Sequence, residues 1–203
     1  MKIYFHLCIE EFTNCYIVCN DDPAVKQALI IDPGKISNEM IAQLEDGGYE
    51  LKAVLITHNH TSHTKGLKTL QKIYSPTVYG ADTDLPSKNI IELHGDGTLL
   101  LAGLKIEYFS VPGHTADSMA FKIGDVIFTG DTIFNGTIGE TSSQYSKRTL
   151  INSIQQKILS QNNDCIIMSG HGPPTTVLAE KSFNIDLPQE SMGQTNIENS
   201  TAV

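Results

Sequence analysis

Three histidines occur within six residues, directly after a short apolar segment. The segment is residues 53–56, and the histidines are His58, His60 and His63. A short apolar run bounded by polar residues is typical of a buried strand. Alternation along an extended chain places the side chains of His58 and His60 on one side. Because neutral imidazole is a common zinc ligand, this spacing predicts a metal-binding strand end rather than three solvated histidines.

Three further polar residues share one setting, because each follows a predicted buried strand at a turn marked by glycine. They are His114, Asp131 and His171, preceded by Gly113, Gly130 and Gly170. Glycine lets the backbone approach a ligand closely. If these strand ends meet at one edge of the fold, they bring enough ligands together for one or two ions. We expect the remaining histidines, His6 and His94, not to be ligands.

The elements that must position these residues are mostly strands. β-Rich runs are predicted at 1–9, 14–20, 27–32, 53–56, 77–80, 90–93, 98–101, 104–111, 118–123, 126–128 and 165–168. Helices are predicted at 38–46 after an N-cap at Ser37, at 65–74, at 147–159, and in a short segment ending near 182. The polar loop 130–143 is too long for a simple connection and is a candidate binding loop. The pattern favours an α/β protein with two sheets face to face and helices outside.

Composition limits the classes of function. The chain has 203 residues and a net charge of −9. This charge argues against a protein that binds the phosphate backbone of a nucleic acid. No stretch of 18 consecutive apolar residues predicts a membrane span, and no signal peptide is recognisable, so we expect a cytoplasmic protein. The four cysteines are predicted to be reduced and buried. We expect one domain over residues 1–183 and a polar tail without ordered structure over 184–203.

The motifs together resemble those of the metallo-β-lactamase superfamily. They are His-x-His-x-x-His at 58–63, Pro-Gly-His-Thr at 112–115, Thr-Gly-Asp-Thr at 129–132 and Gly-His-Gly-Pro at 170–173. The resemblance implies an αββα sandwich of two packed mixed β-sheets with helices on the outer faces. Segments 12–18, 31–34 and 130–134 most resemble the glyoxalase II-like branch, the hydroxyacylglutathione hydrolases, in a short form without their C-terminal helical domain. The resemblance implies one metal ion on His58, His60 and His114, and a second on His63 and His171, with Asp131 bridging.

Several positions depart from the pattern of that family. Ser62 stands where the family has an aspartate ligand of the second ion, which lowers the expected affinity of that site. Lys65 replaces a glycine, and Ala116-Asp117 replace Pro-Gly. Glu140 and Ser142 stand where an arginine and an aspartate are usual, so the loop around them is a poor guide to the substrate.

The resemblance implies a metal-dependent hydrolase of small thioesters or esters, in which a metal-bound hydroxide attacks the carbonyl. The catalytic set would be His58, His60, His114 and Asp131. Zinc is the expected cofactor, as one or two ions, with iron or manganese as alternatives. The expected partner is a small thioester or ester, without nucleic acid or membrane, and the protein is expected to be a monomer or homodimer.

Two other functions stay open. A persulfide dioxygenase-like mononuclear iron enzyme would use His58, His114 and Asp131 as a triad of two histidines and one carboxylate. A degenerate relative would bind a metal ion and catalyse little, because Ser62 removes a ligand.

Overall fold

A computed structural model describes residues 1–188. The first sheet has the order β1-β2-β3-β4-β5-β6. Its first three strands are antiparallel neighbours, and β3 to β6 run parallel. Their bounds are β1 Lys2–Cys8, β2 Thr13–Cys19, β3 Gln27–Ile31, β4 Glu50–Leu55, β5 Thr77–Gly80 and β6 Ile90–Glu92.

The second sheet has the order β12-β11-β10-β9-β8-β7. Neighbouring strands are antiparallel except β10 and β11, which are parallel. The bounds are β7 Gly97–Leu101, β8 Leu104–Ser110, β9 Met119–Ile123, β10 Val126–Gly130, β11 Ile166–Ser169 and β12 Thr175–Thr176. Both sheets are therefore mixed, as the family resemblance implied.

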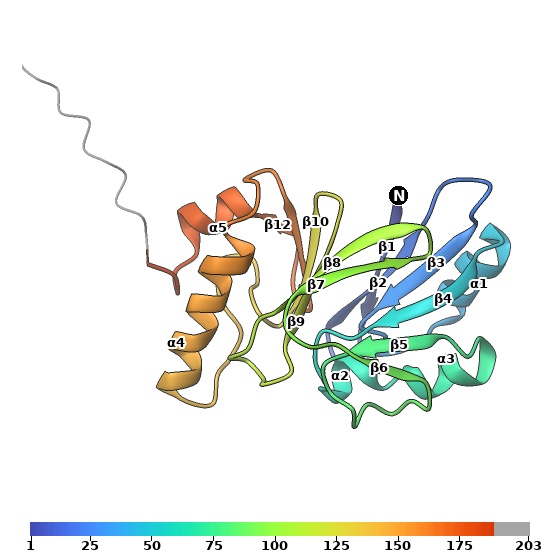
Figure 1. The fold of residues 1–203 in the computed structure, drawn as a ribbon, viewed down its shortest axis with the longest axis horizontal. Coiled ribbons are helices and arrows are strands. Elements are labelled where there is room, and N and C mark those ends of the chain that lie inside the picture. Colours follow the sequence, from blue (N-terminus) through green and yellow to red (C-terminus); the bar gives the residue numbers. More distant parts are fainter. Residues whose placement is uncertain (189–203) are drawn as a thin grey trace, which may run out of the picture.

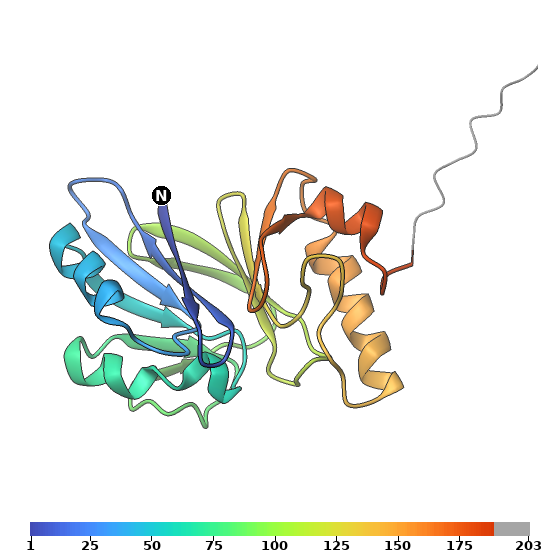
Figure 2. The same ribbon diagram turned by 180° about the vertical axis from the view of Figure 1, so that it is seen from behind.

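Helices cover the outer face of each sheet, which gives four layers (Figure 1). The first sheet carries α1 Asn38–Gly47, α2 Thr61–Thr64 and α3 Leu67–Ile73, and the second carries α4 Gln144–Ser153, a π-helical turn η1 Ile154–Ile158, and α5 Val177–Phe183. The view from behind shows the same separation of the two helical layers (Figure 2). The αββα sandwich predicted from the sequence is confirmed.

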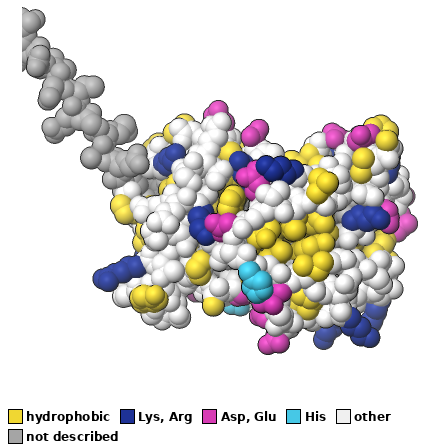
Figure 3. Space-filling view, viewed as in Figure 1, with side chains coloured by type: hydrophobic (Ala, Val, Ile, Leu, Met, Phe, Trp, Pro, Cys, Tyr) yellow, Lys and Arg dark blue, Asp and Glu magenta, His cyan; other side chains and the backbone are white. Residues whose placement is uncertain are grey.

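Three hydrophobic clusters hold these layers together, one at each junction. The middle cluster joins the sheets and includes Phe121 and Phe128, both fully buried. The outer clusters contain Met40 and Leu44 of α1, and Leu150 of α4 together with Ile154 at its C-terminal end. On the face in Figure 3, hydrophobic side chains are visible beside the β7–β8 hairpin, where partly buried Leu99 and Leu101 belong to the middle cluster.

Strand direction brings the C-terminal ends of several strands to one edge of the sandwich. In the first sheet β3 and β4 are parallel, so both end at this edge. In the second sheet β9 is antiparallel to β8 and to β10, so β8 and β10 point the same way, and β11 runs parallel to β10. All the predicted ligands follow β4, β8, β10 or β11 in the chain.

Some elements differ from the predictions. The helix predicted at 65–74 is present as α3, within two residues at each end, but the short helix α2 before it was not predicted. The helix predicted from 147 begins at Gln144, because Ser143 caps it by accepting a hydrogen bond from the Ser146 amide. The short strand β12 was not predicted, since two residues carry no periodic signal.

The segment that follows the predicted domain boundary at residue 183 packs against the domain. Asn184 and Leu187 are buried, and Asp186 pairs with Lys147 on α4 at 2.9 Å. The remainder of the predicted tail lies outside the described residues. All four cysteines are buried and free, as predicted. Within residues 1–188, no helix is long and apolar enough to cross a membrane.

Candidate metal centre

The three histidines of the first motif lie just beyond the strand rather than on it. β4 ends at Leu55, and the chain then turns into the short helix α2, for which His60 is the N-cap residue. The prediction that alternation along the extended chain puts His58 and His60 on one side agrees with the distance between their rings, 4.5 Å. The turn into α2 adds His63, whose ring is 4.3 Å from that of His58.

The first group of candidate ligands combines the two sheets. His58, His60, His114 and Asp131 each offer one atom, and these atoms lie within 4.8 Å of one another. The Nδ1 atom of His60 is 2.8 Å from Nε2 of His58 and 3.2 Å from Nε2 of His114. Two ligands of a tetrahedral zinc ion lie about 3.3–3.5 Å apart, given metal–ligand bonds of about 2.0–2.2 Å. The His60–His114 distance is close to this spacing, whereas the His58–His60 distance is about 0.5 Å shorter.

The second group consists of His63, Asp131 and His171. Asp131 Oδ1 is 3.4 Å from Nε2 of His63, and its Oδ2 is 3.5 Å from Nε2 of His171. Oδ2 also lies 3.8 Å from Nε2 of His58 and 3.7 Å from Nε2 of His114. Asp131 thus stands between both groups, as the family resemblance implied for a bridging ligand.

Hydrogen bonds to backbone carbonyls fix the ring nitrogens of two candidate ligands. His114 Nδ1 donates to the Glu140 carbonyl at 2.7 Å, and His171 Nδ1 donates to the Phe12 carbonyl at 2.8 Å. Because a carbonyl can only accept, Nδ1 of each ring carries a proton, and Nε2 is the nitrogen that faces Asp131. Partners of this kind orient the histidine ligands of many metal sites.

Asp32 plays the same role for the first motif and was missed in the sequence as a site residue. It is buried, and it accepts hydrogen bonds from the Thr57 amide, the Thr57 hydroxyl and His63 Nδ1, at 2.8, 2.6 and 3.0 Å. The Thr57 hydroxyl, whose proton goes to Asp32, accepts from His58 Nδ1 at 3.1 Å. Asp32 has a φ of +49°. The sequence indicated only that this residue lies in a tight turn.

Two buried polar atoms at the centre of the site make no hydrogen bond. They are His63 Nε2 and Asp131 Oδ1. Burying an unsatisfied imidazole nitrogen and carboxylate oxygen is costly, and a metal ion would satisfy both. The residues present therefore fit the metal that the fold family implies.

The charges of the site also favour a cation. Burial and the neighbouring His63 lower the pKa of His58 to about 2, so its ring is neutral. Burial alone would raise the pKa of Asp131, but the neighbouring His171 and His63 hold it well below its usual range. Burial opposes a charge on His63, yet Asp32 and Asp131 raise its pKa to about 10. The centre is a permanent carboxylate surrounded by imidazoles, which attracts protons or a metal ion.

Close packing explains two of the glycines that mark the motifs. A Cβ atom at position 170 would lie 2.3 Å from Asp131 Oδ1, and one at position 130 would lie 2.2 Å from the Thr57 hydroxyl oxygen. Gly130 also has a φ of +50°. The prediction that glycine allows close approach at these turns is confirmed.

The predicted binding loop 130–143 is held by the C-terminal helix. Both carboxylate oxygens of the buried Glu180 lie near the Gly136 amide, at 3.2 and 3.1 Å, and they also accept from Thr175 and Asn184, each at 2.6 Å. The Gly136 carbonyl accepts from the Ile185 amide at 3.0 Å. The loop that carries Asp131 is thus anchored to α5 and the segment after it.

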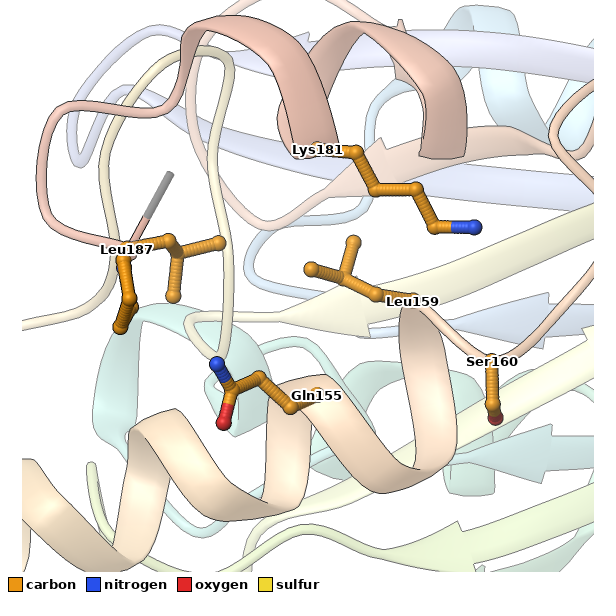
Figure 4. Close-up of a pocket in the computed structure, with 6 residues that line it drawn as sticks. Gln155, Leu159, Ser160, Lys181 and Leu187 are labelled. Atoms are coloured by element: carbon orange, nitrogen blue, oxygen red, sulfur yellow. The ribbon is translucent and has the colours of Figure 1, made fainter. Parts of the chain in front are cut away.

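Two cavities open beside His114. The first, of about 290 Å³, is lined by His114, Asp131, Phe134, Glu140 and His171. The second, of about 320 Å³, is lined by Pro112, Gly113, His114, Thr115, Ala116, Ser142, Tyr145, Ser146 and Thr149. A third cavity, between η1 and the C-terminal segment, contains Gln155, Leu159, Lys181 and Leu187 but none of the candidate ligands (Figure 4).

The two histidines predicted not to be ligands lie outside both groups. His6 is hydrogen bonded through Nε2 to Gln43 at 2.7 Å. The side chain of His94 is largely exposed, and its Nε2 lies 3.5 Å from Glu92.

Comparisons with known proteins agree with this geometry. Residues 9–171 match the model of the metallo-β-lactamase superfamily. The chain is 33% identical over 202 residues to the hydroxyacylglutathione hydrolase GloC of Haemophilus influenzae, covering 88% of this chain and 94% of that protein. The GloC protein and this chain are therefore of nearly the same length.

Solved structures show the same fold. The crystal structure of the B3 metallo-β-lactamase BLEG-1 has a TM-score of 0.80 and 27% identity, covering 92% of this chain and 99% of that one. The structure of ETHE1 from Myxococcus xanthus has a TM-score of 0.79 and 23% identity, covering 91% of this chain and 84% of that one. At that identity, the second similarity concerns the fold alone.

Proposed function

Because this chain belongs to the metallo-β-lactamase superfamily, and its relatives support the glyoxalase II-like branch, we propose that it is a metal-dependent hydrolase of small thioesters or related esters. The observation that carries the proposal is the convergence of His58, His60, His114 and Asp131 at one strand edge. Beside this group lies a cavity of about 290 Å³, large enough for a small acyl compound.

The first group would hold one ion, and His63, His171 and Asp131 would hold a second. When bound, a metal such as zinc acts as a Lewis acid that polarises a carbonyl oxygen and lets water deprotonate near neutral pH. Asp131 would orient the attacking water through Oδ2, which faces His58, His114 and His171. A thioester suits this site because a thiolate, with an ordinary pKa of about 8.5, leaves without a strong general acid.

The dioxygenase alternative is supported by one observation. His58 and His114 lie 3.8 and 3.7 Å from the same oxygen of Asp131, an arrangement that suits a site of two histidines and one carboxylate. It differs from the hydrolase in requiring iron and oxygen.

The test is an assay of the purified protein loaded separately with zinc, manganese or iron(II). A panel of acyl thioesters, including S-lactoylglutathione, is followed by release of the free thiol. We expect turnover that falls at least a hundredfold in His58→Ala and His114→Ala. His94→Ala, which removes an exposed histidine outside the site, is the matched control and should keep full activity.

No turnover with any metal form would contradict the proposal. Oxygen uptake by the iron form with a glutathione persulfide would then support the dioxygenase. Stoichiometric metal binding without either reaction would indicate a degenerate relative.

A further inference from the structure

We propose that this site selects thioesters whose thiol portion is neutral or cationic, and that Glu140 is the residue that excludes anionic ones. The inference rests on the proposed thioester hydrolysis, which it refines by naming the substrate class. It follows from the charges that line the two cavities beside His114.

Both cavities share His114, so a substrate that reacts beside this residue extends into one or both. Neither cavity has a lysine or an arginine in its lining. The larger is lined by hydroxyl groups from Thr115, Ser142, Tyr145, Ser146 and Thr149, and by no charged side chain. In the smaller, Glu140 is the one charged residue outside the candidate ligands.

Basic residues nearby are already engaged by acids. On the turn after α2, Lys65 Nζ lies 3.9 Å from Glu10 and 3.7 Å from Glu11. On α4, Lys147 Nζ pairs with Asp186 at 2.9 Å. Arg148 lines neither cavity. A carboxylate on the substrate would therefore find no free cation among the lining residues.

The position of Glu140 is set by the site itself. Its backbone carbonyl accepts the hydrogen bond from His114 Nδ1 at 2.7 Å, while the residue is exposed at the cavity. Within residues 1–188 its carboxylate has no ion-pair partner at 4.0 Å or less, so its charge acts on the substrate. Phe134 lines the same cavity, and an aromatic face attracts a quaternary ammonium group. Changing the side chain of Glu140 leaves its backbone contact with His114 in place.

The reaction is ordinary hydrolysis. Water forms the new bond to the acyl carbon, the carbon–sulfur bond breaks, and the thiolate leaves and takes up a proton. Only the charge carried by the thiol differs between substrates. One unit charge near an exposed carboxylate changes the free energy of binding by an amount that corresponds to about three- to tenfold in kcat/KM at low ionic strength.

The experiment uses three thioesters with the same acetyl group: acetylthiocholine, S-acetyl-N-acetylcysteamine and S-acetyl-3-mercaptopropionate. They carry a cationic, a neutral and an anionic thiol portion. For the metal-loaded protein, kcat/KM should be lowest for the anionic substrate, by at least tenfold relative to the cationic one. Glu140→Gln should reduce this ratio about tenfold or more, because the two substrates differ by two unit charges, and Glu140→Lys should reverse it. The preference should weaken in 0.5 M sodium chloride, because salt screens exposed charges.

Glu50→Gln is the matched control, since it removes one charge at the start of β4, the strand end opposite the site. It should leave the ratio unchanged. Affinities of the corresponding S-ethyl thioethers, measured by calorimetry, report the charge preference without turnover. Equal or better use of the anionic substrate, or an unchanged ratio in Glu140→Gln, would overturn the inference. Absence of turnover with these three and with the whole thioester panel would overturn the proposed hydrolysis, while the thioether affinities would still decide the charge preference.

Discussion

At the scale of single residues, the candidate centre depends on groups that hold its histidines in place. Asp32 contacts both Thr57 and His63, and through the Thr57 hydroxyl it also fixes His58. One carboxylate thus orients ligands of both groups. Removing the Asp32 carboxylate should disturb both groups of candidate ligands, although Asp32 is not itself a candidate ligand.

We predict that Asp32→Asn weakens metal binding about 10- to 100-fold, the usual effect of losing such a partner. Asparagine has the same shape and tolerates a positive φ, so the backbone should be retained. Its amide cannot accept from His63 Nδ1 and both Thr57 groups at once. The measurement is zinc affinity by competition with a chromophoric chelator, with circular dichroism to check the fold. Affinity equal to that of the native protein would contradict the role assigned to Asp32.

We propose that Ser62 determines how many ions the centre holds. It lies on α2 next to His63, where a carboxylate would add a ligand and a negative charge beside the second group. We predict that Ser62→Asp raises the affinity for a second zinc ion at least tenfold. Elemental analysis after dialysis against a fixed free zinc concentration should give one ion per chain in the native protein and two in the variant. Equal stoichiometry would mean that His63, Asp131 and His171 suffice alone.

The sequence predicted every candidate ligand but not the groups that orient them. Histidine spacing and glycine-marked turns are local signals, so His114 and His171 were recognisable. Their partners are the carbonyls of Glu140 and Phe12. Every residue has a carbonyl, so the residue type gives no indication of such a contact. Asp32 was visible only as a turn residue, because its partners lie 25 and 31 positions away.

At the scale of elements, the loop 130–143 and α5 act as one unit through Glu180. Donors from Gly136, Thr175 and Asn184 surround its two oxygens. We predict that Glu180→Gln lowers the free energy of unfolding by roughly 1–3 kcal/mol, because the new amide group would face a donor. Activity should fall with it, since Phe134 and Glu140 lie on this loop. Urea denaturation and kcat/KM measure the two effects, with Glu50→Gln as control. An unchanged unfolding free energy would refute the anchoring role.

The ion pair between Lys147 and Asp186 joins α4 to the segment after α5. The hydrogen bond from Lys147 lowers the pKa of Asp186. A carboxyl group whose folded pKa is depressed stabilises the fold above its unfolded pKa of about 3.9 and loses that contribution as the pH falls through the folded value. Asp186→Asn should therefore cost up to about 1 kcal/mol at pH 7 and nothing near pH 2. Urea unfolding at several pH values tests this. The control is Asp84→Asn, which changes an exposed aspartate that has no ion pair within residues 1–188. A deficit independent of pH would exclude the ion pair as its cause.

Elements with a clear local sequence pattern were predicted well, whereas two short elements without one, α2 and β12, were not. β5 and α1 match their predicted positions within one residue, because burial and capping leave a clear pattern. The turn α2 and strand β12 are set by tertiary contacts instead. The segment 184–188 looked like a polar tail, yet Leu187 packs against the cluster beneath α4. A single buried leucine leaves no periodic signal.

At the scale of the whole molecule, the candidate centre joins the two sheets. His58, His60 and His63 follow β4 of the first sheet, whereas His114, Asp131 and His171 follow strands of the second. An ion bound by both sets is a cross-link between layers that otherwise meet through the middle hydrophobic cluster. Metal binding should therefore contribute to the stability of the entire sandwich, because the unfolded chain does not hold this arrangement.

We predict that chelation lowers the melting temperature by about 10 °C. Free metal at a thousand times its dissociation constant stabilises the native state by about 4 kcal/mol, and in a chain of this size each kcal/mol shifts Tm by about 2–4 °C. Calorimetry of the zinc-loaded protein before and after treatment with EDTA measures the shift. His60→Ala, which removes one candidate ligand of the first group, should reduce the shift in Tm by more than half. His94→Ala should show the same shift as the native protein. A Tm that does not respond to zinc or chelator in the native protein would mean that no ion bridges the sheets, and the hydrolase proposal would lose its physical basis.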